Sequence, residues 1–277
     1  MNDVTAVIPC FNDGAYIQEA VDSLLSQTVM PDRIIIVDDG SDLRTRSIIE
    51  KIDHPLINVI YQENQGVAAA RNRAISKVKT SYVVTLDADD SFEPTFIEKA
   101  LVAIKSKPEV VAVCCYYQKY KNNKPVLDVI KPLGGNVVNF LVKNNGQASA
   151  LFKKSIWEKI GGYDVNFVNG YEDWEFWIAM LRDGNYMHII PETLWRYRIK
   201  NSSRDQIALA TYDFELKQQL YVKHKDLYLR HFEKVYSELT WRQKALNQSV
   251  INLKSSKQYK IGGIFISPIR FVKRLFK

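Results

Sequence analysis

The chain has 277 residues, with 46% hydrophobic and 25% charged side chains, which suits a soluble globular protein with one large domain and a modest appendage. Its formal net charge of +7 comes from residues 251–277, which hold seven basic residues and no acidic one. The rest of the chain is therefore neutral overall, so charge gives no support to a nucleic-acid-binding face, and no nucleic acid partner is expected.

The cysteines and the chain start indicate a reducing compartment. Cys10, Cys114 and Cys115 show neither disulfide nor zinc-ligand spacing, and we expect buried free thiols. The first residues lack a secretory signal pattern, and no apolar run reaches the length of a membrane-spanning helix. The sequence predicts a cytoplasmic protein.

Short apolar runs alternate with amphipathic helical patterns through the first half of the chain. Strands are predicted at residues 4–9, 33–37, 57–61, 81–86 and 110–117, with helices between them. This alternation predicts an α/β fold with a Rossmann-like, mostly parallel central sheet and helices on both faces. Beyond residue 118 the pattern is less regular, and the later elements are predicted as a helix at 171–182, strands at 188–191 and 193–199, and helices from 205 to 255.

Three polar clusters follow predicted strands directly. They are Phe11-Asn12-Asp13, Asp38-Asp39-Gly40 and Asp87-Ala88-Asp89-Asp90. In a parallel sheet the carboxyl ends of the strands share an edge, and ligands bind there at a switch in strand order. We therefore expect the three clusters to lie close together.

Each cluster also has an ordinary structural explanation. Asp89, Asp90 or Ser91 could cap the helix that starts near Pro94, and an Asp-Asp-Gly sequence is typical of a tight turn. The functional alternative is that Asp87 and Asp89 hold Mg²⁺ or Mn²⁺ together with a nucleotide diphosphate, because these cations prefer oxygen ligands.

Two further predicted helices carry charged residues that could bind a ligand or take part in catalysis. Arg71 lies in an Ala-rich predicted helix and is either a surface residue or a planar cation that recognises a phosphate or base. Glu172 and Asp173 begin the next strongly predicted helix, where acidic residues also favour the helix macrodipole. The functional interpretation makes Asp173 a general base for an incoming hydroxyl.

The segments VIPCFND, IIIVDDGS, ENQGVAAARN, VVTLDADD, IGGYD and GYEDWEFW occur in this order and spacing. As a set they resemble the inverting glycosyltransferases of family 2, over about residues 3–200. The resemblance implies a GT-A fold with a catalytic domain at 1–204. Its nucleotide-sugar half spans about 1–118 and its acceptor half about 119–204, and a helical C-terminal segment follows at 205–277.

The resemblance also implies roles for individual residues. Asp173 is the expected base, with Glu172 beside it. Asp89, with Asp87, is the expected ligand of Mn²⁺ or Mg²⁺. Relatives often carry a histidine near Lys200, so Lys200 and Arg198 are expected to contact the diphosphate instead. The expected nucleotide-binding set is Pro9, Phe11, Asp13, Asp39, Arg71, Asp87 and Ala88.

The implied activity is a metal-dependent, inverting hexosyltransferase that uses a nucleotide-sugar donor, with UDP as the expected carrier. A Q-x-x-R-W element of processive synthases is absent, so one sugar is transferred per encounter. The expected acceptor is a glycan or lipid-linked oligosaccharide in O-antigen or capsule synthesis. The alternatives are a sugar nucleotidyltransferase, whose Gly-rich basic loop is missing here, and a non-catalytic nucleotide-sugar or carbohydrate-binding protein.

The C-terminal residues add two expectations about partners. Residues 260–277, KIGGIFISPIRFVKRLFK, interleave apolar and basic side chains, a pattern typical of peptides that lie on an anionic membrane surface. This predicts a peripheral location at the inner face of the cell membrane, and docking onto the catalytic domain is the alternative. Residues 208–239 carry enough apolar and aromatic side chains for a homodimer surface.

Overall fold

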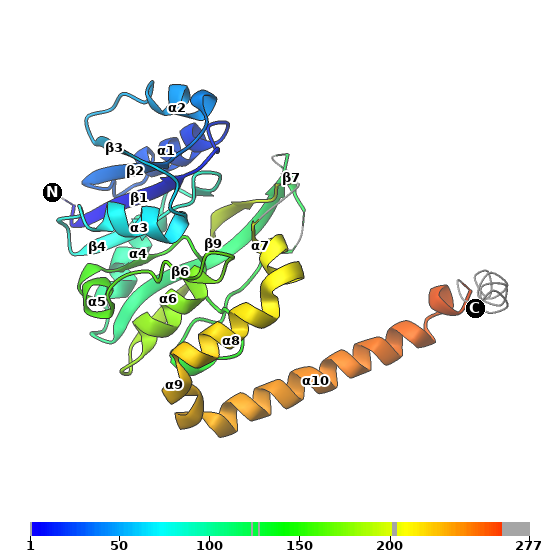
Figure 1. Ribbon diagram of the computed structural model, residues 1–277. Helices are drawn as coiled ribbons and strands as arrows, with labels where there is room; N and C mark the ends of the chain where they lie inside the picture. The colour runs from blue at the N-terminus through cyan, green and yellow to red at the C-terminus, as the bar shows by residue number, and fades with distance from the viewer. Residues whose placement is uncertain (1, 123, 127, 201–203, 262–277) are drawn as a thin grey trace. The chain divides into compact units, whose positions relative to one another are not determined.

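Figure 1 shows the computed structural model, which describes residues 2–122, 124–126, 128–200 and 204–261. The chain packs as two compact units, residues 1–227 and residues 228–277.

The first unit is built on one central sheet. Within the described residues its nine strands are β1 (Val4–Cys10), β2 (Arg33–Asp39), β3 (Ile57–Gln62), β4 (Tyr82–Thr85), β5 (Ser91–Phe92), β6 (Val110–Lys121), β7 (Lys124–Pro125), β8 (Leu151–Lys153) and β9 (Tyr186–Arg198). Their order is β3-β2-β1-β4-β8-β6-β9-β5, with β7 beside β6. The run from β3 to β4 is parallel, as is the pair β6 and β9, whereas β8, β5 and β7 run antiparallel to their neighbours.

The strand order reverses at β1. The chain places β2 and β3 on one side of β1 and then returns to add β4 on the other side. The carboxyl ends of β1 and β4 therefore flank the switch point at which ligands bind in open α/β sheets.

Helices connect the strands and cover the sheet. In the first unit they are α1 (Ile17–Leu25), α2 (Leu43–Ile49), α3 (Val67–Ile75), α4 (Phe96–Lys105), the 3₁₀ turn η1 (Val137–Phe140), α5 (Lys154–Ile160), α6 (Glu172–Leu181), α7 (Arg204–Ile207), the π-helical turn η2 (Ala208–Tyr212) and α8 (Asp213–Lys223). A short helix, α9 (Lys225–Arg230), spans the division between the units, and α10 (Phe232–Ser255) forms the second.

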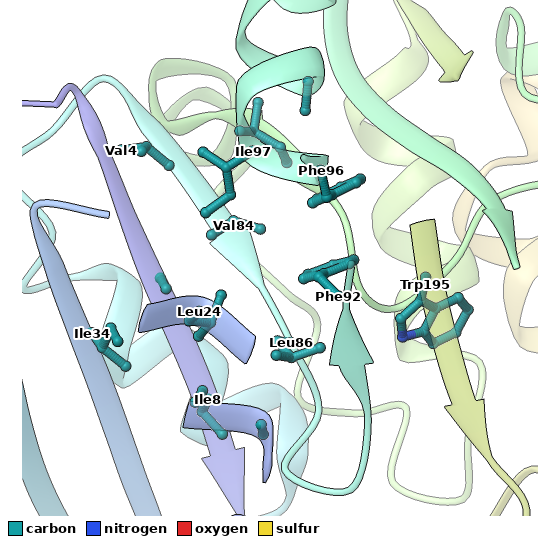
Figure 2. Close-up of a cluster of buried hydrophobic side chains, with 14 of the residues drawn as sticks. Val4, Ile8, Leu24, Ile34, Val84, Leu86, Phe92, Phe96, Ile97 and Trp195 are labelled. Atoms are coloured by element: carbon teal, nitrogen blue, oxygen red, sulfur yellow. The ribbon is translucent and has the colours of Figure 1, made fainter. Parts of the chain in front are cut away.

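Both faces of the sheet are buried. Ile34 and Ile36 of β2 point into one hydrophobic cluster, whereas Ile35 and Val37 alternate with them and are buried on the opposite face. Leu24 from α1 packs into the first cluster (Figure 2). The β-branched run at 34–37 is therefore apolar at every position because helices cover both sides. The predicted α/β class with a mostly parallel sheet is confirmed.

The cluster in Figure 2 also joins the two halves of the sheet. The rings of Phe92 in β5 and Phe96 in α4 stack with centroids 3.9 Å apart. Trp195 of β9 lies in the same cluster as Leu86, which follows β4. This packing brings the end of β9 to the edge where the loops after β1 and β4 begin.

Two local expectations were wrong. Helix α4 begins at Phe96 with Thr95 at its N-cap and no side-chain capping bond, so none of Asp89, Asp90 and Ser91 caps it. Ser91 instead belongs to β5, and the Asp90 carboxylate binds the end of β9. The two strands expected at 188–191 and 193–199 form the single strand β9, whose register against β6 shifts near Pro191, a residue without a backbone N–H.

The compact units divide later than the expected boundary at residue 204. Helices α7 and α8 pack within the first unit, where Ala208, Leu216 and Leu220 are buried. No helix among the described residues is long and apolar enough to cross a membrane. Of the predicted basic tail, residues 262–277 lie outside the described residues.

Candidate active site

A cavity of about 800 Å³ opens at the carboxyl edge of the parallel strands in the first unit. Its lining includes all twelve side chains that the sequence predicts for the site: Pro9, Phe11, Asp13, Asp39, Arg71, Asp87, Ala88, Asp89, Glu172, Asp173, Arg198 and Lys200. The three strand-end clusters therefore gather as expected, and the acids at the start of α6 form part of the same cavity.

The end of β2 organises the loop before α3. The buried Asp39 carboxylate accepts hydrogen bonds from the backbone N–H groups of Gln65 (2.9 Å) and Gly66 (2.9 Å). Its Oδ1 also accepts from the side chain of Gln62 at 2.6 Å. Gly66 has a φ of +88°, a conformation that favours glycine, and opens the helix that carries Arg71. Asp39 thus shapes the cavity wall that it lines.

Arg71 connects the two sides of the cavity. Its side chain is only 2% exposed, and it donates to Asp87 Oδ1 at 2.6 Å and to Glu172 Oε1 at 3.1 Å. Burial acts to lower the pKa of Arg71, but the charges of Asp87, Tyr163 and Glu172 outweigh it and raise the pKa. The guanidinium is therefore a permanent cation that holds Asp87 and Glu172 at fixed positions.

Lys200 lies between the carboxyl ends of β1 and β4. Its ammonium group is 2.8 Å from Asp13 Oδ1 and 2.8 Å from Asp89 Oδ2. Burial opposes the charged form of Lys200, but the two carboxylates raise its pKa above the usual value. Burial raises the pKa of Asp89, and the charge of Lys200 opposes that rise. A single lysine thus pairs with the acids on both sides of the switch point.

Arg198 fixes the loop that carries Asp89. Its backbone N–H donates to Asp90 Oδ1 at 2.8 Å, and its Nε donates to the Asp89 carbonyl at 2.8 Å. The guanidinium continues to Glu19 Oε2 at 2.5 Å and lies over the ring of Tyr16. Asp90 is buried, and burial raises its pKa strongly, assisted by Asp89 and Asp87. Arg198 therefore acts as a positioning residue for the acidic loop.

Helix α6 begins from a constrained turn. Tyr171 has a φ of +62°, which is unfavourable for a bulky side chain, and Gly170 before it has a φ of +129°. The Tyr171 hydroxyl donates to Asp213 of α8 at 2.5 Å, and its ring contacts Trp174. Backbone strain of this kind persists only where the surroundings hold it, and it is common at functional sites. Here it directs the first turn of α6 toward the cavity.

The two acids of that first turn have different environments. Glu172 is 6% exposed and accepts from Arg71 and also from Arg204, whose guanidinium is 2.9 Å from Oε2. Asp173 is half-buried, and its Oδ2 accepts from the side chain of Asn144 at 2.8 Å. Glu172 is thus held by two cations, whereas Asp173 accepts from the Asn144 amide on Oδ2 and from the backbone N–H of Trp174 on Oδ1.

Asn144 and Arg204 are functional candidates that sequence reasoning missed. Both line the cavity and both bind an acid of α6. Asn144 belongs to an irregular polar loop, and Arg204 is the last residue of the predicted catalytic domain, so neither occupies a recognisable motif. Only the folded chain brings them to Glu172 and Asp173.

Comparison with known proteins identifies the family. Residues 5–161 match the family model described as glycosyl transferase family 2. The chain belongs to this family. A relative, the putative teichuronic acid biosynthesis glycosyltransferase TuaG of Bacillus subtilis, is 28% identical over 205 residues, which cover 72% of this chain and 80% of TuaG. The chondroitin synthase of Pasteurella multocida is 29% identical over 194 residues, but the match covers 67% of this chain and only 20% of that protein.

The fold of this family 2 glycosyltransferase is also found in solved structures. The crystal structure of S. aureus TarS 1-349 in complex with UDP-GlcNAc matches with a TM-score of 0.62 at 17% sequence identity. The match covers 73% of this chain and 60% of the TarS chain. The expected GT-A fold is therefore confirmed.

The acidic loop has the donor chemistry for a divalent cation. Asp87 and Asp89 place carboxylate oxygens, the preferred ligands of Mn²⁺ and Mg²⁺, on the cavity wall. Within the described part of the chain no group of three or more His, Cys, Asp or Glu side chains is arranged to hold a metal. Two carboxylates are nevertheless sufficient where substrate phosphates and water complete the coordination. The residues present fit such an ion, with Lys200 as a competing cation at Asp89.

Lys200→Met is expected to tighten Mn²⁺ binding to the enzyme alone about tenfold, roughly 1.4 kcal/mol, because the variant lacks a positive charge that repels the ion and occupies Asp89. Titration followed by electron paramagnetic resonance measures the free ion. Lys159→Met, which breaks an exposed pair with Asp183, is the matched control and should leave the affinity unchanged. Equal affinities for wild type and Lys200→Met would show that Lys200 does not compete for Asp89.

Proposed function

We propose that this protein transfers a sugar from a UDP-sugar to an acceptor hydroxyl with inversion at the anomeric carbon. The observation that supports this most strongly is the shared cavity, with Asp87 and Asp89 in one wall and Asp173 in another. A displacement needs a leaving group and an activated nucleophile on opposite faces of the reacting carbon. Arg71 spans these two walls through Asp87 and Glu172.

Asp173 is the proposed general base. In the proposed step the acceptor oxygen bonds to the anomeric carbon, the bond from that carbon to the diphosphate oxygen breaks, and the diphosphate leaves with the bonding electrons. The acceptor proton moves to Asp173. Asn144 holds one carboxylate oxygen of Asp173, which orients the base without adding a positive charge that would weaken it. A single displacement of this kind inverts the anomeric configuration.

The donor-side residues bind and orient the nucleotide diphosphate. Phe11 is 49% exposed at the cavity and offers an aromatic face to a nucleobase. Pro9, Asp13, Asp39 and Ala88 complete the proposed nucleoside wall. Lys200 supplies positive charge where the diphosphate would lie, while Arg198 supports the same loop. Asp89 and Asp87 would hold Mn²⁺ or Mg²⁺, which when bound neutralises the charge that develops on the leaving diphosphate.

The relatives suggest the substrate class. TuaG is named for teichuronic acid biosynthesis, and the TarS structures contain UDP-GlcNAc or UDP. We therefore propose a UDP-hexose or UDP-N-acetylhexosamine donor and an acceptor in cell-surface polysaccharide synthesis. A lipid-linked acceptor agrees with the basic and apolar composition of residues 260–277, which would keep the enzyme at the inner face of the membrane.

Release of nucleotide diphosphate tests the proposal. Incubation with a panel of UDP-, GDP- and dTDP-sugars and Mn²⁺ is expected to release UDP slowly from one donor by hydrolysis, and faster when an acceptor glycan is added. Pyrophosphate-dependent formation of a nucleoside triphosphate would instead indicate a nucleotidyltransferase. Saturable donor binding without turnover, with or without acceptors, would indicate a binding protein.

A further inference from the structure

The helix α10 presents an apolar stripe to solvent that one glutamine interrupts. Six apolar side chains along one line of its 24 residues are 41–61% exposed: Phe232, Tyr236, Leu239, Leu246, Val250 and Leu253. Ile251, 57% exposed, and Trp241, 64% exposed, lie off this line. Together with Gln243 the six positions follow one another at alternating spacings of four and three residues. This is the heptad spacing of a coiled-coil seam, which repeats every 3.5 residues.

The seam needs another helix to cover it. A single helix in water is marginally stable without packing of its apolar face. A straight helix buries a 3.5-residue repeat along its whole length only when a partner with the same repeat supercoils around it. At about 1.5 Å per residue, α10 offers a seam roughly 36 Å long. We propose that α10 pairs with α10 of a second copy of this chain in a parallel, in-register, two-stranded coiled coil.

The residue types at the seam favour two strands. In heptad terms Phe232, Leu239, Leu246 and Leu253 occupy the d positions, and Tyr236, Gln243 and Val250 occupy the a positions. A β-branched residue at a with leucine at d favours parallel dimers over larger assemblies. The leucine-rich d layer and Val250 match this preference in the second half of the helix.

Gln243 selects the parallel, in-register arrangement. In a parallel pair each a residue faces the same a residue, so the two Gln243 amides can donate to and accept from one another. In an antiparallel pair Gln243 would face a d residue, all of which are apolar here, and its amide would be buried without a partner. Within one helix Gln243 donates to Asn247 at 3.0 Å, a bond that the helix can exchange for the pairing across the seam.

The flanks of the seam do not oppose this pairing. Parallel geometry places Arg242 near Asn247 of the partner subunit and Ser249 near Lys254 of the partner subunit, so neither contact joins like charges. Arg242 is also neutralised within its own helix by Glu238 at 2.7 Å. In a parallel pair the C-terminal ends of the two α10 helices, at Ser255, lie side by side.

Sedimentation velocity of the full chain at micromolar concentrations tests the coil. The wild type is expected at twice the chain mass of 32.0 kDa. Leu246→Lys should raise the dimer dissociation constant about a hundredfold or more, because two leucines per dimer lose their apolar contact and two charges meet at the seam. Trp241→Lys is the matched control, since Trp241 is 64% exposed, close to the 60% of Leu246, but lies off the seam.

The control distinguishes pairing along the seam from non-specific association through any exposed apolar side chain of α10. Dimers that persist in Trp241→Lys but not in Leu246→Lys support the coil, and thermal melting of each variant shows that the first unit still folds. A monomeric wild type would overturn the proposal and would indicate that residues 262–277 of the same chain, not a second copy, are the partner of the seam. Equal loss of dimer in both variants would also overturn it.

A cysteine at the centre of the seam tests the register. Gln243→Cys should form an intermolecular disulfide under mild oxidation at pH 8, whereas Gln248→Cys, on the outer face, should not. The natural cysteines are buried free thiols, and burial raises the pKa of Cys10 and Cys115 to about 12, so they react little at this pH. A dimer in which Gln243→Cys fails to cross-link would exclude the parallel register.

Discussion

Asp173→Asn is expected to lower kcat for sugar transfer about 10³-fold, the usual loss when a general base is removed. Asparagine keeps the size of the side chain and can still bond with Asn144 after rotation of one amide, but it cannot accept the acceptor proton. The donor KM should change little, because Asp87 and Asp89 remain in place. Steady-state kinetics with a matched donor and acceptor pair measures both constants.

The control for this substitution is another aspartate far from the cavity. Asp226→Asn breaks an exposed pair with Arg182 and should retain wild-type activity. Full transfer activity in Asp173→Asn would move the role of base to another group. A rise in donor KM with unchanged kcat would instead place Asp173 in donor binding.

Arg71→Met is expected to reduce the free energy of unfolding by about 3–5 kcal/mol, because it leaves the carboxylates of Asp87 and Glu172 without the buried cation between them. Methionine fills much of the same space, so the loss reports charge compensation more than packing. Arg204 still contacts Glu172, and the Asp87 side chain remains 28% exposed to solvent, so the loss should lie nearer the lower end of this range. Chemical denaturation measures the difference.

Arg182→Met provides the comparison, since it removes an arginine–aspartate pair of similar length, 2.7 Å, whose side chains are 35% and 53% exposed. Its cost should stay within about 1 kcal/mol, as is usual for surface pairs. In a double-mutant cycle, Arg71→Met should lose less stability in the Glu172→Gln background than in wild type. Equal costs for Arg71→Met and Arg182→Met would contradict a central role for Arg71 in holding the site together.

The strand-end motifs could be placed from the sequence because they depend on local patterns. Short, continuous apolar runs locate β1, β2 and β4, whose residues are buried on both faces of the sheet, and parallel connectivity brings the residues after them to one edge. This reasoning placed Asp13, Asp39 and Asp89 around one cavity. It could not show that Asp39 binds the loop before α3, because that contact joins residues 26 and 27 positions apart.

The electrostatic connections needed the folded chain. Arg71 and Glu172 are separated by 101 positions, and Lys200 and Asp13 by 187, yet each pair forms a direct bond. No periodic pattern encodes such pairs, because they arise from how separate elements pack. The sequence therefore identified Arg71 as a candidate ligand for phosphate, whereas its contacts make it a positioning residue inside the site, and its predicted role in nucleotide binding stays a prediction.

The sequence by itself determined the fold class, the family and twelve residues that line the cavity, since these rest on hydrophobic patterns and on short motifs in a fixed order. Only the tertiary structure decided which side chains form ion pairs and hydrogen bonds with those residues. It placed Lys200 between Asp13 and Asp89, Asn144 on Asp173, and two arginines on Glu172. The physical reason is that hydrophobic patterns involve residues that are close in the sequence. Ion pairs depend instead on distances between side chains, which only the packed chain defines.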